Sequence, residues 1–349
     1  MNQPNPTPGQ SGSPLESRYR RLLRVYPGDY QAERGDEIVG TYLDTVGPGR
    51  RWPSLNDAVD LLSAGLRERL RGYGASGLVA ALPLAATAAL STLVAVAAFL
   101  LVQVEFEDPR FARLDPVGPI QTLGAVIWLG WLVVGLAATA LPGVWARRGA
   151  AVGLLLTIVV PPAAALIGQP GPPLFVLLPA VALGVAALAL PAHPGWVSRS
   201  LPPLSAACVT AASVTLSYGE RGANMFTSYS STPELLAMAG GLMIALVLLV
   251  ALGRALRADD SGLWAALLLV TPAGLFGANQ LSQGVWGSQG GEPTSAAFAV
   301  TTASILLSGA ALLTIAVAGQ AARHRTVRRR ALDSTCPTCG HQRKIPTEA

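Results

Sequence analysis

Eight long runs of uncharged, mostly apolar residues fill the chain between residues 75 and 320. Seven of these runs approach or exceed the roughly 20 residues that an α-helix needs to cross a bilayer. Because backbone groups in lipid must be hydrogen-bonded within their own segment, runs of this length fold as helices. The sequence therefore predicts an all-α fold, a polytopic helical membrane bundle with about eight transmembrane helices. The predicted spans are residues 78–102, 119–141, 150–168, 173–190, 202–218, 234–253, 263–281 and 296–318.

The fifth run, residues 202–218, is short and rich in serine and threonine, so hydropathy alone also allows a re-entrant or interfacial segment. The arginines favour a full span. With eight spans and a cytosolic N-terminus, 13 of the 16 arginines between residues 67 and 330 lie in cytosolic segments and three in outer loops. Without the fifth span the distribution becomes seven inside and nine outside, which contradicts the positive-inside tendency. We therefore expect a plasma-membrane protein with both termini in the cytoplasm.

Charged side chains are scarce, and this scarcity argues against several classes of function. Only 13% of the residues are charged, about half the share in ordinary globular domains. Lys344 is the only lysine, which excludes a Walker-type phosphate loop and a buried Schiff-base lysine. The predicted spans hold no charged residue except Glu234 at the edge of one, and the acidic segment 103–118, with Glu105, is expected to be an outer loop. The sequence thus argues against a membrane-embedded enzyme and an ion-coupled carrier.

The N-terminal 74 residues precede the first span. Residues 1–12 are mostly Pro, Gly, Asn and Gln without an apolar period, so we expect them to be disordered. Residues 13–74 are expected to form a cytosolic prefix of three short amphipathic helices. The first helix begins after Ser13, whose hydroxyl caps free amide groups, and the third begins at Pro53-Ser54. The apolar stripe predicted for the third helix consists of Ala58, Leu61, Leu62, Gly65, Leu66 and Leu70.

Residues 321–349 form a tail with seven basic and two acidic residues. Next to a membrane span, such a cluster is typical of a topology signal and of contact with anionic lipids, so we expect no specific nucleic-acid binding. Two thiolates separated by two residues, Cys336 and Cys339, can bind one zinc ion, and His341 could be a third ligand. A fourth would come from His324 or from a second protomer. The alternative is a reduced tail without metal, and no other cofactor is expected.

Proline and amide residues interrupt some of the apolar runs. Pro161 and Pro162 remove two amide donors in the middle of the third run, which is expected to kink or unwind there. Asn279 and Gln280 lie near the outer end of the seventh run, and Gln121 near that of the second. Broken helices can form the substrate site of a transporter, whereas interhelical packing uses the same kinds of residues.

The prefix carries a series of recognisable motifs. The sequence YRRLLRVYP at residues 19–27 is followed by GDEI at 35–38 and by GLRERL at 65–70. These motifs resemble the cytosolic prefix of uncharacterised actinobacterial multi-pass membrane proteins, in which similar prefixes precede permease-like domains. The resemblance covers roughly residues 14 to 72 and implies no catalytic residues. The near-absence of lysine is also similar to actinobacterial coding of high GC content.

The polar features of the sequence lie on the cytosolic side, while the spans lack charge. We therefore expect a non-enzymatic regulatory or assembly component that is embedded in the lipid bilayer. Its prefix and tail would contact a protein partner on the cytosolic side. The alternative is a transporter or permease subunit for a neutral or lipophilic small molecule, which the interrupted runs and the permease-like resemblance favour.

Overall fold

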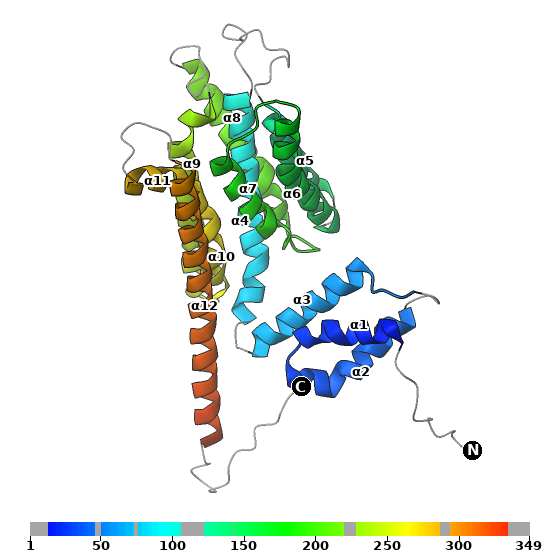
Figure 1. Ribbon diagram of the computed structural model, residues 1–349. Coiled ribbons are helices and arrows are strands. Elements are labelled where there is room, and N and C mark those ends of the chain that lie inside the picture. Colours follow the sequence, from blue (N-terminus) through cyan, green and yellow to red (C-terminus); the bar gives the residue numbers. More distant parts are fainter. Residues whose placement is uncertain are drawn as a thin grey trace, which may run out of the picture. The chain divides into compact units, whose positions relative to one another are not determined.

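The computed structural model describes residues 13–45, 50–72, 76–105, 122–141, 143–219, 228–286 and 294–333. Within these ranges the chain is all-helical, with twelve α-helices and no strand (Figure 1). The chain divides into two compact units. Unit 1 consists of residues 1–79 and 316–349, and unit 2 of residues 80–315.

The prefix forms the three helices that the sequence predicts. The hydroxyl of Ser13 accepts a hydrogen bond of 3.1 Å from the backbone N–H of Glu16, which confirms the predicted N-cap. A short 3₁₀ turn after the first helix leads to Pro27, where the chain turns into the second. The elements are α1 (Pro14–Leu22), η1 (Leu23–Val25), α2 (Gly28–Thr45) and α3 (Leu55–Gly72).

A small aromatic core holds the prefix together. Tyr19 is fully buried and stacks on Tyr42, with ring centroids 5.5 Å apart. At Gly65 on α3, a Cβ atom would lie only 2.8 Å from the ring of Tyr26, so glycine lets α3 approach that ring closely. The buried residues of this core are Leu15, Tyr19, Leu23, Tyr26, Val39 and Leu61.

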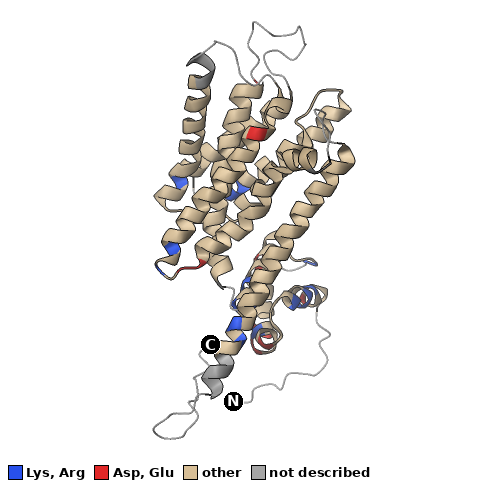
Figure 2. Ribbon diagram, turned by 90° about the vertical axis from the view of Figure 1, so that its left-hand side faces the viewer, with Lys and Arg blue, Asp and Glu red and all other residues tan. Residues whose placement is uncertain are grey.

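All eight apolar runs form helices, as the sequence predicts. Charged residues are sparse along these helices in Figure 2. In chain order they are α4 (Ser76–Leu100), continued by a π-turn labelled η2 (Leu101–Glu105), α5 (Gly124–Ala140), α6 (Gly143–Leu166), α7 (Leu174–Ala187), α8 (Trp196–Gly219), α9 (Pro233–Ala255), α10 (Ser261–Phe276) with α11 (Ala278–Trp286), and α12 (Ser295–Asp333). A 3₁₀ turn, η3 (Tyr229–Ser231), precedes α9.

Four helical stretches in the described part of the chain are long and apolar enough to cross a bilayer. A fifth is added if α10 and α11, which are bent by 58° at their junction, are taken as one span. Helices α5 and α7 are apolar but shorter. These helices indicate association with a membrane. The four stretches are Gly77–Glu105, Gly143–Leu166, Pro233–Ala255 and Ser295–Val327.

Two details of the spans differ from the expectation. The helix of the first run continues through the π-turn to Glu105, so this residue ends a helix and does not belong to a loop. Helix α6 passes through Pro161 and Pro162 without interruption, so the expected unwinding does not occur. The break lies instead between α10 and α11, at Gly277.

Trp131 is the centre of the contact among α5, α6 and α7. Its side chain is fully buried, and its Nε1–H donates to Thr157 Oγ1 at 2.9 Å. Glycines flank the ring on both neighbouring helices: a Cβ atom at Gly153 or Gly184 would lie 3.2 or 3.1 Å from ring atoms. The large indole thus fills space that small residues on α6 and α7 leave open.

Candidate functional site

A buried carboxylate at the end of the first long apolar helix is the most unusual polar group in unit 2. The side chain of Glu105 is fully buried. Its Oε2 accepts a hydrogen bond from the backbone N–H of Thr122 at 2.9 Å, and its Oε1 accepts one from the Thr122 hydroxyl at 2.6 Å. The phenol of Tyr229 also donates to Oε1. We call Glu105, Thr122, Trp128 and Tyr229 the Glu105 cluster.

Two chains of donors converge on this carboxylate. Trp128 Nε1–H donates to the Tyr229 oxygen at 2.9 Å, and Tyr229 in turn donates to Glu105. The N–H of Gly124 donates to the Thr122 hydroxyl at 2.9 Å, which donates to the same carboxylate. Hydrogen bonds in such a chain polarise one another and favour negative charge at its end. No ion pair among the described residues involves Glu105.

The π-turn brings Glu105 into the interior. Residues Leu101–Glu105 form one wide turn at the end of α4, and four of these five residues are buried. Within the turn, Gln103 donates to the backbone carbonyl of Ser213 on α8 at 2.9 Å. Single π-turns inside long helices are rare and occur frequently at functional sites.

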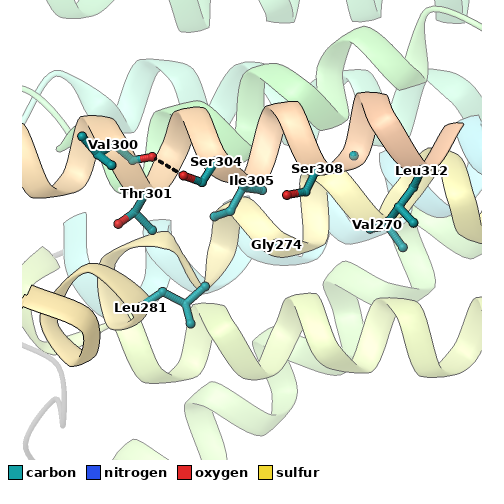
Figure 3. A pocket seen from close by; sticks show the side chains of 10 residues that line it. Val270, Gly274, Leu281, Val300, Thr301, Ser304, Ile305, Ser308 and Leu312 are labelled. Atoms are coloured by element: carbon teal, nitrogen blue, oxygen red, sulfur yellow. Dashed lines mark hydrogen bonds between the residues drawn. The ribbon is translucent and has the colours of Figure 1, made fainter. Parts of the chain in front are cut away.

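A groove lies where α10 and α11 meet α12 (Figure 3). Its volume is about 380 Å³, and its walls are apolar apart from hydroxyl groups on α12. Ser304 uses its hydroxyl to donate to the carbonyl of Val300 at 2.8 Å, as the dashed line in Figure 3 marks. Small residues allow α12 and α10 to come close, because a Cβ at Gly309 would collide with Thr271. The lining residues are Val270, Gly274, Leu281, Val300, Thr301, Ser304, Ile305, Ser308, Gly309 and Leu312.

In the prefix, two tyrosines fix the orientation of α3. Tyr19 donates to Asp57 Oδ2 at 2.8 Å, and Tyr42 donates to Asp60 Oδ2 at 2.7 Å. Burial, followed by the hydrogen bond to Asp57, raises the pKa of Tyr19 to about 12. Hydrogen bonds from Ser54 and Tyr19 lower the pKa of Asp57. The Asp57 carboxylate therefore stays an ionised acceptor at neutral pH and holds one side of α3 against the core.

The other side of α3 exposes apolar side chains. The predicted stripe was wrong in one respect, because its residues divide between two sides of the helix: Leu61 and Gly65 are buried, whereas Leu62 and Leu66 are exposed. Near the start of α3, Trp52 is exposed and lies under the Arg18 guanidinium, 3.4 Å from its ring centroid. The α3 apolar face consists of Leu55, Val59, Leu62 and Leu66, with exposed fractions of 85, 64, 39 and 55%.

The predicted zinc ligands Cys336, Cys339 and His341 lie outside the described residues. Within the described ranges, no group of three or more His, Cys, Asp or Glu side chains could hold a metal ion. Asn279 is buried at the start of α11, beside the α10–α11 break, whereas Gln121 also lies outside the described residues.

The sequence did not identify the Glu105 cluster. Its members come from three separate segments, and the carboxylate stands 17 residues from Thr122 and 124 residues from Tyr229. The one local signal is that Glu105 stands three residues after the end of an apolar run. Comparisons with protein-family models, with curated proteins and with solved structures give no match for this chain, so its function must be inferred from these sites.

Proposed function

We propose that this chain is a non-enzymatic regulatory or assembly component of the plasma membrane, and that its prefix binds a cytosolic protein through the α3 apolar face. The observation that supports this function is the exposure of Leu55, Val59, Leu62 and Leu66. The prefix has its own buried core, so these four side chains are not needed to complete it. Contiguous apolar patches on a folded surface mark interaction sites.

The spacing of the face suggests the kind of partner. Its residues follow one another at intervals of four, three and four, which places them along one stripe of the helix. Such a stripe matches the i, i+3, i+4, i+7 anchors of a second amphipathic helix. Polar residues of α3 lie beside the stripe, among them Asn56 and Arg67. An apolar centre with a polar rim is the usual anatomy of a protein interface.

The membrane part of the proposal is eight spans with both termini in the cytoplasm. Support comes from the helical state of all eight runs and from the arginine distribution. Helix α8, which contains the doubtful fifth run, has 24 residues and is about 36 Å long at 1.5 Å per residue. That length suffices for the roughly 30 Å hydrocarbon core.

Site-specific photocrosslinking in the producing cells tests the proposed partner contact. A photoreactive amino acid at Leu62 of the full chain is expected to capture one discrete protein. The double variant Val59→Glu, Leu66→Glu is expected to lower the yield of that adduct by about tenfold or more, because two apolar anchors worth over 1 kcal/mol each are lost. Both side chains are exposed, so the fold of the prefix should be retained.

Two controls keep this result specific. The matched variant Asn56→Glu adds a charge at an exposed α3 position beside the face and should leave the yield unchanged. A photoreactive group at Arg34, exposed on α2, should not capture the same protein. Adducts to lipid alone at Leu62, or equal capture from Arg34, would contradict a protein contact through α3.

A second candidate function is transport of a neutral or lipophilic small molecule, which the groove at the α10–α11 break favours. If it transports, the full chain in vesicles moves a neutral lipophilic dye faster than protein-free vesicles do. Ser304→Leu places a larger apolar side chain in the groove and is expected to reduce the flux severalfold. Leu307→Met, at an exposed position of α12, is the control and should not. Flux equal to that of protein-free vesicles would exclude this candidate for the dye tested.

A further inference from the structure

A fully buried carboxylate without an ion-pair partner among the described residues needs a reason to persist in a membrane protein. Transferring an isolated carboxylate out of water is costly, and such residues within membrane segments usually have a function. Three donated hydrogen bonds, two from Thr122 and one from Tyr229, offset part of this cost for Glu105. The geometry of these bonds also shows which ligand the site can accept.

Among the described residues Glu105 has no set of metal ligands around it, because no group of three or more His, Cys, Asp or Glu side chains lies together there. A Cβ atom at Gly124 would lie 2.4 Å from Glu105 Oε1, 2.5 Å from Pro172 Cγ and 2.7 Å from the Tyr229 oxygen. There is therefore no room for a methyl group at that position, between the carboxylate, the proline ring and the phenol. The hydroxyl groups of Thr122 and Tyr229 already donate hydrogen bonds to the Glu105 carboxylate, so a metal ion could bind it only by displacing these bonds. A proton is the ligand that requires no such space.

Protonation would change the hydrogen bonding of the cluster. The three groups that hydrogen-bond directly to Glu105 are all donors: the Thr122 N–H, the Thr122 hydroxyl and the Tyr229 hydroxyl. When a hydronium ion transfers its proton to the carboxylate, a water molecule leaves and a neutral acid with an O–H donor remains. The neutral acid accepts weaker hydrogen bonds than the anion does, so protonation weakens the bonds that Thr122 and Tyr229 donate.

We propose that Glu105 is a proton-binding site, and that protonation loosens the contact of the π-turn with the start of α5 and with η3. Thr122 stands two residues before α5, and Tyr229 opens η3, which leads into α9. Protonation of the Glu105 carboxylate therefore affects the ends of three helices, α4, α5 and α9, which are far apart in the sequence. This site would make unit 2 respond to acid at the membrane face where α4 ends, whatever partner the prefix binds.

Few other groups can titrate beside Glu105. On η3, Tyr229 is the titratable neighbour in hydrogen-bonding contact. From the side of α5, the contacting groups are Thr122, Gly124 and Trp128, which do not titrate. Helix α8 contacts the π-turn through the backbone carbonyl of Ser213. In the described part of the chain, the Glu105 carboxylate is thus the group of this cluster that acid would protonate.

Infrared difference spectroscopy of the full chain in lipid vesicles tests the proposal. The acid-minus-neutral spectrum of the wild type is expected to contain the C=O stretching band of a protonated carboxylic acid that exchanges slowly in D₂O. Glu105→Gln should lose this band, whereas the matched control Glu234→Gln, at an exposed helix start, should retain it. An unchanged band in Glu105→Gln would overturn the proposal.

A second measurement examines the coupling and does not depend on the Gln variant. Amide hydrogen exchange at residues 122–128, corrected for its intrinsic pH dependence, should become faster in acid in the wild type. Tyr229→Phe keeps the carboxylate and removes one donor to the anion, so the same acceleration should begin at higher pH. An exchange rate that stays independent of pH in the wild type, or a midpoint that Tyr229→Phe leaves in place, would contradict proton coupling.

Discussion

Replacing Trp131 by alanine is expected to lower the free energy of unfolding of the full chain in mixed micelles by about 3–5 kcal/mol. The side chain is fully buried between α5, α6 and α7, and the glycines on both neighbouring helices cannot fill the space that it leaves. The hydroxyl of Thr157 also loses the indole donor, although it keeps its own bond to the Gly153 carbonyl. Unfolding by titration with SDS measures the change.

Two further variants separate packing from the hydrogen bond at this position. Trp131→Phe keeps most of the ring and loses the N–H, so its cost should be clearly smaller than that of alanine. Trp145→Ala removes an indole that is 53% exposed at the start of α6 and should cost much less than Trp131→Ala. If Trp145→Ala and Trp131→Ala cost equally, the proposed role of the α5–α6–α7 contact is wrong.

Replacing Tyr19 by alanine is expected to destabilise the prefix by about 3–5 kcal/mol. The ring is fully buried, stacks on Tyr42 and supplies the hydroxyl that Asp57 accepts. Hydrogen exchange of the prefix amides in the full chain should accelerate by about two to three and a half orders of magnitude. The rates in α4 to α12 serve as an internal reference.

Tyr19→Phe is the informative companion. It retains the stacked ring and loses only the hydrogen bond to Asp57, whose carboxylate can still accept from the Ser54 N–H. We expect a cost of about 1–2 kcal/mol, less than that of alanine. Equal acceleration in both variants would mean that the hydrogen bond, and not the packed ring, stabilises α1 against α3.

Periodicity and capping residues were sufficient to predict where helices form. The apolar runs are longer than the roughly 9–11 residues of a membrane-spanning β-strand, and each forms a helix. The signal at Ser13-Pro14-Leu15-Glu16 is local, because the capping hydroxyl and its amide are three residues apart. Such features depend on neighbouring residues alone, which is why a single sequence reveals them.

The Glu105 cluster could not be predicted in the same way. A carboxylate after an apolar run, followed by Glu107 and Asp108, has the pattern of a solvated loop. Its burial depends on a π-turn and on hydroxyl groups 17 and 124 residues away. Likewise, hydropathy predicts one apolar stripe on α3, and tertiary contacts such as the packing of Tyr26 against Gly65 distinguish its buried side from its exposed side.

The length of α12 has a mechanical consequence. The helix is continuous over 39 residues and contains no proline. Residues 295–322, which carry no charged side chain, extend over about 42 Å, and residues 323–333 add about 16 Å beyond them. Because α12 is one continuous helix, a rotation or a shift of its uncharged part along the helix axis would also move residue 333, after which the cysteine-containing tail begins.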